Sequence, residues 1–198
     1  MVVTIKHIEK ANYLLDKGLH VLWDKGYNGT SVNDIVKAAG VPKGSFYFYF
    51  ESKEDFAVKA IDRYFVIMTA PVSDILDNKE EPSALRRLFN LLEYKNQTVK
   101  DEFDCIGCMA CNVTAEMANH SEKIRNVLSK NENEFRGKLI AVLKEAQEMG
   151  EVSTTIIAEN IIPFIEDAWK GAMITVKMSQ DHKALDNALA YSKLLLTR

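Results

Sequence analysis

The chain has 198 residues, of which 47% are hydrophobic, and a formal net charge of −3. This length and apolar content can bury one large core or two modest ones. No stretch is long and apolar enough to span a membrane, and the first ten residues lack the apolar run of a signal peptide. We therefore expect a cytoplasmic protein whose three cysteines are reduced.

The charge is unevenly distributed along the chain. Residues 1–50 contain six lysines and four acidic residues, a formal charge of +2, so the remainder carries −5. A mildly basic N-terminal part on an acidic body is typical of a protein that binds a polyanion such as DNA with one end. This difference in charge between the two parts is small, so it supports DNA binding only together with the motifs described below.

The first predicted helix runs from Thr4 to Lys25 and is amphipathic. Its role is to brace the segment that follows, and neither His7 nor His20 has a partner at metal-ligand spacing. The apolar residues recur at three- and four-residue steps, which is the period of one helix face. They are Ile8, Ala11, Leu15, Leu19 and Leu22.

Residues 27–50 are predicted to form two short helices joined by a tight turn. Thr30 or Ser31 can cap the first of them, which covers 32–39 and ends at Gly40 because glycine takes the left-handed conformation cheaply. Pro42 has its φ already set for the first turn of a second helix over 43–49. This pattern predicts a helix-turn-helix, whose second helix enters the major groove of DNA.

The second short helix has a composition suited to DNA contact. Lys43, Gly44 and Ser45 at its start allow close approach to phosphates and base edges. Tyr47 and Tyr49 add hydroxyl groups on rigid rings. The alternative is an aromatic cluster that packs an ordinary three-helix core. Phe46 and Phe50 are expected inside, but the other three aromatic residues cannot all be buried on so short a helix.

This region resembles the DNA-binding segment of the TetR family of transcriptional repressors. The resemblance lies in Gly26-Tyr27, Thr30-Ser31-Val32, Ile35, Ala38-Ala39-Gly40-Val41, Lys43-Gly44-Ser45-Phe46-Tyr47-Phe48-Tyr49-Phe50 and Lys53-Glu54. Phe48 departs from the family, which often has a hydrogen-bonding residue there, and offers only apolar contact, for example to a thymine methyl group. The resemblance implies DNA contacts from Thr30, Ser31, Pro42, Lys43, Gly44, Ser45, Tyr47, Phe48, Tyr49 and Lys53.

A long helix is predicted from Ser52, with Lys53 in its first turn. A solvated lysine is the simple alternative to the phosphate contact that the resemblance implies for Lys53. Pro71 is expected to kink or end this helix. We expect residues 1–52 to form the DNA-binding domain and residues 53–198 an effector-binding and dimerisation domain.

The rest of the chain is predicted to be helical, so the fold class is all-α. No segment shows the clear alternation of a strand. Polar breaks are expected at 77–82 and 100–104, and Pro163 is expected to bend the helix in which it lies. The expected helices cover residues 83–98, 105–118, 121–149, 154–179 and 181–197.

All three cysteines, Cys105, Cys108 and Cys111, lie close together and are expected on one side of a helix. They are either small buried apolar residues, thiols that sense redox state or electrophiles, or part of a metal site. The metal site would need Asp104, Glu116 or His120 as a fourth ligand, and no second Cys-x-x-Cys motif is present.

A second resemblance bears on these cysteines. Gly107-Cys108-Met109, with Asn112, Glu116 and Arg125, is similar to a signature in the ligand domain of one TetR subgroup. The resemblance makes Cys108 the main candidate for a thiol sensor, because some relatives sense electrophiles through the matching cysteine. Cys105 and Cys111 lie outside the signature as candidate resolving thiols.

The last two predicted helices carry an unusually wide apolar surface. This is either the surface of deeply buried core helices or, as the family resemblance implies, a two-fold four-helix dimer interface. A dimer would also present two DNA-binding heads to a palindromic site. The candidate interface residues are Ile161, Ile165, Ala168, Ala172, Leu185, Leu189, Ser192 and Leu196.

These patterns together predict a homodimeric DNA-binding regulator without cofactor or metal. It is expected to repress until a small molecule or thiol modification releases it from operator DNA. The alternatives are a cysteine-based redox enzyme, for which a matching His-Cys-carboxylate arrangement is lacking, and a dimeric helical protein without DNA binding. The expected effector pocket contains Phe65, Phe103, Cys108, Asn112, Phe135 and Trp169.

Overall fold

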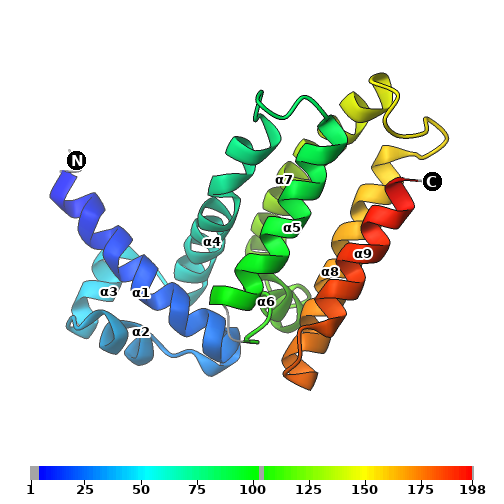
Figure 1. The fold of residues 1–198 in the computed structure, drawn as a ribbon. Coiled ribbons are helices and arrows are strands. Elements are labelled where there is room, and N and C mark those ends of the chain that lie inside the picture. The colour runs from blue at the N-terminus through cyan, green and yellow to red at the C-terminus, as the bar shows by residue number, and fades with distance from the viewer. Residues whose placement is uncertain (1–4, 103–104, 198) are drawn as a thin grey trace. The chain divides into compact units, whose positions relative to one another are not determined.

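The computed structural model describes residues 5–102 and 105–197, and these residues form helices and connecting turns without a strand (Figure 1). The predicted all-α fold class is confirmed. The helices are α1 (Ile5–Gly29), α2 (Val32–Ala39), α3 (Lys43–Tyr49), α4 (Lys53–Leu76), α5 (Ala84–Glu102), α6 (Met109–Met117), α7 (Glu122–Glu148), α8 (Ala158–Ser179) and α9 (Lys183–Leu196).

Helices α4 and α5 continue past positions where a break was predicted. Helix α4 continues past Pro71, because burial of Val72 and Leu76 in the core offsets the one backbone hydrogen bond that the proline removes. Helix α5 continues through the polar stretch that was predicted to break it at 100. Val99, which is 2% exposed, anchors its last turns.

Helix α6 begins later than predicted, at Met109 rather than at 105. Cys105 has a φ of 59° and Gly107 a φ of 81°, so the backbone around them is left-handed and cannot be α-helical. The prediction that the three cysteines share one side of a helix is therefore wrong. Cys105 and Cys108 precede the helix, and only Cys111 lies on it.

The chain forms two compact units, which we describe separately. The first contains Met1–Met68 and Met109–Asn131, and the second contains Thr69–Cys108 and Glu132–Arg198. The predicted domain boundary between residues 52 and 53 does not coincide with this division. The predicted boundary lies at the start of α4. The first sixteen residues of α4 belong to the first unit, because their apolar side chains pack with those of α1 to α3.

The core of the first unit holds α1 against α2 and α6. Phe46 of α3 and Phe56 of α4 are both fully buried there. Gly18 lies where the helices come closest, since a Cβ atom at this position would be 2.7 Å from Ile35 and 2.6 Å from Phe56. Glycine in α1 therefore allows α2 and α4 to pack against it.

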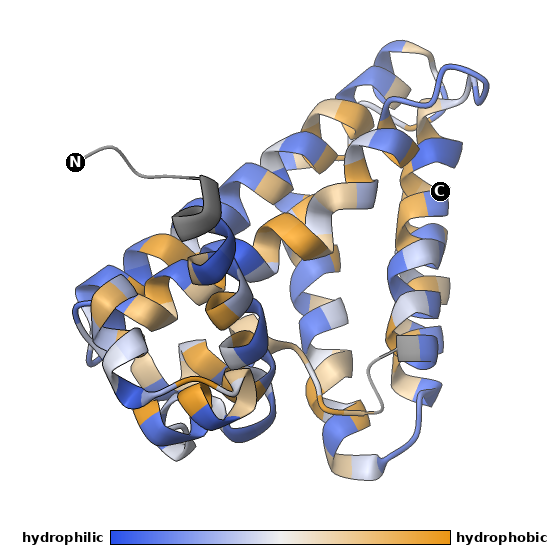
Figure 2. Cartoon of the chain, turned by 90° about the vertical axis from the view of Figure 1, so that its left-hand side faces the viewer, coloured by the Kyte–Doolittle hydropathy of each residue, from blue (hydrophilic) through white to orange (hydrophobic). Residues whose placement is uncertain are grey.

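The core of the second unit brings together the end of α4 and helices α5, α7, α8 and α9. Helices α8 and α9 lie side by side, next to α5 (Figure 1). Hydrophobic and hydrophilic residues alternate along single helices (Figure 2), as expected for amphipathic helices that bury one face. The fully buried members of this core include Val72, Ala84, Leu88, Leu91, Leu139, Leu143, Ala146, Ile162 and Leu196.

Among the residues that the structure describes, no helix is long and apolar enough to cross a membrane.

Candidate functional sites

The start of α2 is held by a reciprocal pair of hydrogen bonds. The Ser31 hydroxyl accepts the Asp34 N–H at 3.1 Å, and the Asp34 carboxylate accepts the Ser31 N–H at 2.9 Å. Hydrogen bonds from the Ser31 side chain and from Lys25, 2.9 Å away, hold the pKa of the Asp34 carboxyl well below its usual range. Gly40, with a φ of 67°, ends the helix as predicted.

Helix α3 presents aromatic rings on two opposite sides. Phe46 is fully buried, with ring centroids 5.2 Å from Phe50 and 5.8 Å from Phe56. The prediction that Phe46 and Phe50 lie inside is confirmed. Because these rings fix the orientation of the helix, Tyr47 and Phe48 extend outward and are 56% and 68% exposed.

The other residues in or next to this helix that were predicted to contact DNA are at least partly accessible. Pro42, Lys43 and Gly44 are exposed, and Ser45 and Tyr49 are half-buried. The Phe48 ring meets the Tyr49 ring edge-on, with centroids 5.0 Å apart. The helix thus offers a lysine, a backbone without side chain at Gly44 and three aromatic rings on its accessible side.

Two predicted DNA contacts have other partners in the structure. Thr30 is 2% exposed, and its hydroxyl donates to the Gly26 carbonyl at 2.6 Å. The Lys53 ammonium donates to the carbonyls of Tyr27 and Thr30, both at 3.0 Å, and lies over the Tyr27 ring. The Thr30 side chain is therefore too buried to contact DNA, and Lys53 holds the turn between α1 and α2.

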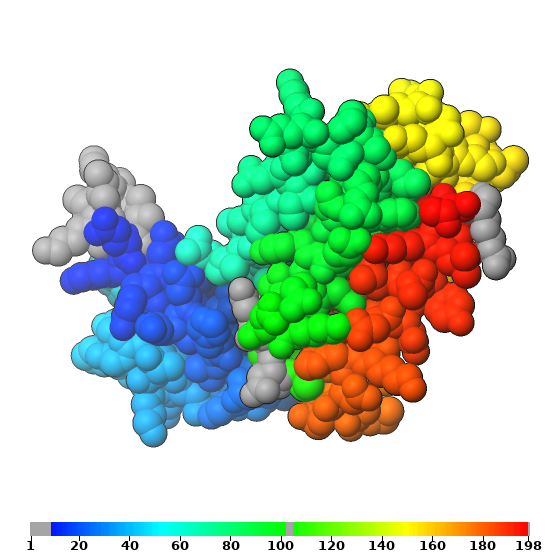
Figure 3. Space-filling view, in the orientation of Figure 1, coloured from blue at the N-terminus to red at the C-terminus, as the bar shows by residue number. Residues whose placement is uncertain are grey.

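The outer face of α8 and α9 contains an open hollow of about 600 Å³. Figure 3 shows these two helices, in orange and red, at the surface beside α5. The hollow is lined by small and apolar residues from both helices, and Phe164 and Tyr191 at its edge are 58% and 66% exposed. The lining residues are Phe164, Ala168, Ala172, Ala184, Asn187, Ala188, Tyr191, Ser192, Leu194 and Leu195.

Most of the predicted dimer-interface residues face the core of their own protomer and not the outer hollow. Ile165, Leu185 and Leu196 are 2% exposed or less, and their side chains are buried within their own protomer. Ile161 and Leu189 pack partly against the same core. The regular stripe on which the prediction rested is thus the inner face of α8 and α9. Only Ala168, Ala172 and Ser192 of the predicted set line the outer hollow.

A buried ion pair joins α5 to α8 in the second unit. The Lys95 ammonium lies 2.8 Å from both carboxylate oxygens of Glu166, which is 3% exposed. The ammonium is also 4.9 Å from the ring centroid of Phe135 and 4.3 Å from that of Trp169. The indole N–H of Trp169 is buried without an acceptor among the described residues.

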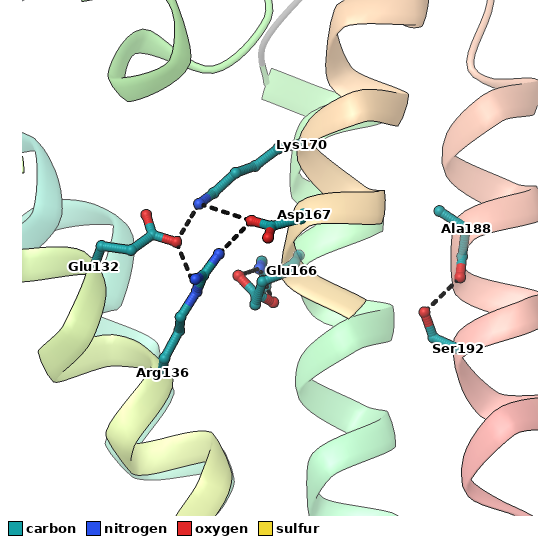
Figure 4. Close-up of polar contacts among 8 residues, drawn as sticks. Glu132, Arg136, Glu166, Asp167, Lys170, Ala188 and Ser192 are labelled. Atoms are coloured by element: carbon teal, nitrogen blue, oxygen red, sulfur yellow. Dashed lines mark hydrogen bonds and ion pairs between the residues drawn. The ribbon is translucent and has the colours of Figure 1, made fainter. Parts of the chain in front are cut away.

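Sequence reasoning found the two aromatic residues but missed the ion pair. An acidic residue within the apolar sequence of α8 was the available signal, because a carboxylate at a core position needs a cationic partner. Figure 4 shows a second set of charges near it, in which Glu132 and Arg136 of α7 pair with Asp167 and Lys170 of α8. These charges join α7 to α8.

The predicted effector residues are divided between the two units. Phe135 and Trp169 meet around Lys95 in the second unit, to which Cys108 also belongs. Phe65 and Asn112 belong to the first unit. Phe103 lies outside the described residues.

The cysteine segment contains one polar contact of chemical interest. Cys105 is buried, and its Sγ atom lies 3.5 Å from Nε2 of His182, at the start of α9. Cys108 is buried and Cys111 is half-buried. The described residues contain no cluster of three or more histidine, cysteine or acidic side chains that could hold a metal ion.

Comparison with known proteins gives consistent matches over both units. Residues 14–60 match a family described as bacterial regulatory proteins of the tetR family, and residues 84–192 match the tetracyclin repressor-like C-terminal domain. The chain is 30% identical to the transcriptional repressor NemR of Escherichia coli over 200 residues, covering 96% of each protein. It is also 30% identical to the repressor DhaR of a Mycobacterium species over 177 residues, covering 89% of this chain and 87% of DhaR.

The same similarity is found among solved structures. The crystal structure of the reduced form of E. coli NemR matches with a TM-score of 0.85 and 25% identity, covering 93% of this chain and 95% of that one. Regulatory protein TetR from Rhodobacter sphaeroides matches with a TM-score of 0.84 and 26% identity, covering 92% and 96%.

Proposed function

The chain belongs to the TetR family of bacterial transcriptional regulators, and we propose from this that it is a homodimeric repressor that binds operator DNA through α3. The relatives NemR and DhaR are named repressors, which favours repression over activation. Because the proposed ligand is chromosomal DNA, we expect the protein to act in the cytoplasm.

The exposed rings of Tyr47 and Phe48 carry this proposal. Large aromatic side chains that are more than half exposed on a seven-residue helix need a partner that covers them. A major groove provides one, since base edges and thymine methyl groups accept such contacts and phosphates surround them. In this proposal the exposed Lys43 at the helix start contacts a phosphate, while Thr30 and Lys53 support the turn that precedes α2.

We expect Tyr47→Ala to weaken operator binding about tenfold to a hundredfold, because one base contact is worth about 1–3 kcal/mol. Lys43→Ala should weaken binding to all sequences alike and reduce the salt slope by about one unit, the signature of one lost phosphate contact. Both effects can be measured by fluorescence anisotropy with a duplex selected by the wild-type protein from a random-sequence pool.

Tyr94→Ala is the matched control, because Tyr94 is an exposed tyrosine of α5 in the other unit. Its operator affinity should equal that of the wild type. If the Tyr47 and Lys43 variants bind as tightly as this control, or if binding does not change with salt, the proposed DNA surface is wrong.

The proposed dimer uses the outer face of α8 and α9. A second copy related by two-fold symmetry would fill the hollow beside Ala168 and cover Phe164 and Tyr191. Small residues in the hollow favour close approach of helices, and the aromatic residues at its edge favour burial. This surface replaces the predicted stripe, whose large aliphatic residues are already buried within the protomer.

The proposed effector site lies in the second unit, beside the buried pair of Lys95 and Glu166. A ligand with an acceptor oxygen would satisfy the indole N–H of Trp169, for which the described part of the chain provides no acceptor. Such a ligand would change operator binding only if its affinity differs between the DNA-binding and released states. Phe135 and Trp169 would provide the apolar contacts of the site.

Thiol modification is a second candidate for the releasing signal, favoured by the contact between Cys105 and His182. A neutral imidazole can accept the thiol proton, and the sulfur can then add to an electrophilic double bond, forming a C–S bond while the adjacent carbon takes up a proton. Cys108, the cysteine indicated by the family resemblance, is three residues away.

We expect N-ethylmaleimide to weaken operator binding of the wild type by about tenfold or more, a typical allosteric coupling. The response should be lost in Cys105→Ser or in Cys108→Ser, whichever thiol reacts, and kept in Cys111→Ser. Anisotropy before and after treatment measures it. A variant with all three cysteines replaced that still responds would exclude thiol regulation.

A further inference from the structure

The turn between α1 and α2 determines where the helix-turn-helix begins. Gly26 has a φ of 71° and a ψ of 177°, so the helical path of α1 is broken there, before the chain reaches the cap of α2 at Ser31. Four residues, 27–30, therefore connect the bracing helix to the DNA-binding motif. Any change in their backbone would move α2 and, through Gly40 and Pro42, α3.

Glu116 of α6 binds this turn from a distant part of the sequence. Its Oε2 atom accepts the N–H of Asn28 at 2.6 Å. Its other carboxylate oxygen occupies the space beside Gly26, where a Cβ atom would overlap Oε1. The carboxylate is half-buried, and a charged acceptor makes a stronger hydrogen bond than a neutral one.

The carbonyl groups of the turn are bound by two hydrogen-bond donors, one charged and one neutral. The Lys53 ammonium donates to the carbonyls of Tyr27 and Thr30, and the Thr30 hydroxyl donates to the carbonyl of Gly26. Glu116 thus supplies the acceptor for an N–H group, while Lys53 supplies donors for carbonyls. The two charged residues therefore bind an N–H group and carbonyl groups of the turn, and the Thr30 N–H adds a backbone hydrogen bond to the Tyr27 carbonyl at 3.3 Å.

Helix α6 is itself firmly placed within the first unit. Met109 and Val113 are fully buried, and α6 packs against α1. Just after α6, the hydroxyl of Ser121 donates to Glu54 of α4 at 2.7 Å and accepts the N–H of Ile124 at 3.1 Å, which caps α7. Glu116 therefore extends from a helix that packs against α1, and the residue that begins the next helix is hydrogen-bonded to α4.

We infer that Glu116 is a positioning residue for operator recognition: from α6, it holds the turn at Gly26–Asn28 in the conformation that presents α2 and α3 to DNA. The inference rests on the proposed function and extends it, because it makes a residue outside the helix-turn-helix part of the DNA-binding unit. Glu116 does not contact DNA in this proposal.

The first test compares Glu116→Ala and Glu116→Gln with the exposed control Glu122→Ala, which removes the same charge from the same unit. We expect Glu116→Ala to weaken binding to the selected duplex about tenfold or more. Glu116→Gln keeps an acceptor oxygen and should rescue part of the loss. The control should bind like the wild type, and circular dichroism should show that all three variants are folded.

A second readout separates positioning from general destabilisation. Hydrogen exchange measured by NMR should be accelerated at the Asn28 amide in Glu116→Ala, while amides in the core of the first unit keep their protection. In Glu122→Ala, exchange at Asn28 should be unchanged. Equal acceleration throughout the unit would mean that Glu116 only stabilises the fold, and would overturn the inference.

A double-mutant cycle tests the contact without using DNA. In the wild type, Gly26→Ala introduces both an unfavourable positive φ and an overlap with Glu116. In the Glu116→Ala background only the φ cost remains, so Gly26→Ala should lower the thermal midpoint less. Additive effects of the two substitutions would show that the carboxylate does not occupy this space, and would overturn the inference.

The experiments distinguish a failure of the proposed DNA-binding function from a failure of the positioning role of Glu116. If Tyr47→Ala weakens operator binding but Glu116→Ala does not, the DNA surface stands and the positioning role is wrong. If the wild-type protein selects no duplex, the proposed function fails, and the positioning role fails with it even where the cycle confirms the contact.

Discussion

Replacing Ala168 by glutamate is expected to convert the protein from a dimer to monomers and to abolish measurable operator binding. Ala168 is exposed in the protomer and lines the hollow between α8 and α9, so the substitution should not disturb folding of the single chain. In the dimer the carboxylate would be buried without a cationic partner, which costs about 3–5 kcal/mol. That corresponds to a rise in the dimer dissociation constant of a hundredfold or more, by the usual ratio of about 1.4 kcal/mol per tenfold.

Sedimentation equilibrium and anisotropy measure the two parts of this prediction. Ala70→Glu is the control, because Ala70 is an exposed alanine on α4 and is not among the residues that line the hollow. It should remain dimeric and bind the selected duplex. If the Ala168 variant is as dimeric as this control, the outer face of α8 and α9 is not the dimer interface.

Replacing Lys95 by methionine is expected to destabilise the second unit by about 3–5 kcal/mol. Methionine fills most of the space between Phe135 and Trp169, so the loss comes from charge rather than from a cavity. Glu166 is 3% exposed, and Lys95 is its ion-pair partner among the described residues, so the substitution would leave a buried carboxylate without that cation. Chemical denaturation followed by circular dichroism measures the loss.

Two further variants test whether the unpaired carboxylate causes the loss of stability in Lys95→Met. Lys95→Met combined with Glu166→Leu removes both charges and should recover most of the stability, because an apolar pair can replace a buried ion pair at little cost. Lys144→Met breaks the exposed pair with Glu159, whose side chains are 52% and 54% exposed, and should cost less than about 1 kcal/mol. If the double variant is as unstable as Lys95→Met, the loss comes from packing and not from the unpaired carboxylate.

The sequence by itself determined the DNA-binding motif, because the signals for that motif are local. Ser31 and Asp34 are three residues apart, which is the spacing of a reciprocal helix cap. Gly40 takes a left-handed conformation that few other residues tolerate, and Phe46 and Phe50 are one helical turn apart. These properties depend on neighbours in the chain. Thr30 or Ser31 was predicted as the cap, and the structure assigns the cap to Ser31; the predicted helix end at Gly40 and the burial of Phe46 and Phe50 are confirmed.

The orientation of α8 and α9 was decided only by the tertiary structure. Both helices carry apolar residues on more than one side, so the helical period identifies two apolar faces but does not say which one is the core. Packing against α5 and α7 buries the regular stripe that includes Ile165 and Leu196. The outer face is left with Ala168, Phe164 and Tyr191, which the prediction had not recognised as one surface.

The polar contacts between distant segments also depended on the tertiary structure. The ammonium of Lys53 donates to two carbonyls 23 and 26 residues away, contacts that were not predicted, and Glu116 binds an amide 88 residues away. Lys95 and Glu166 are 71 residues apart. A charged side chain can pair with any opposite group that the fold brings near it, and its sequence neighbours carry no information about which group that is. The sequence therefore determined the helices and the motif, and packing determined the partners of the buried charges.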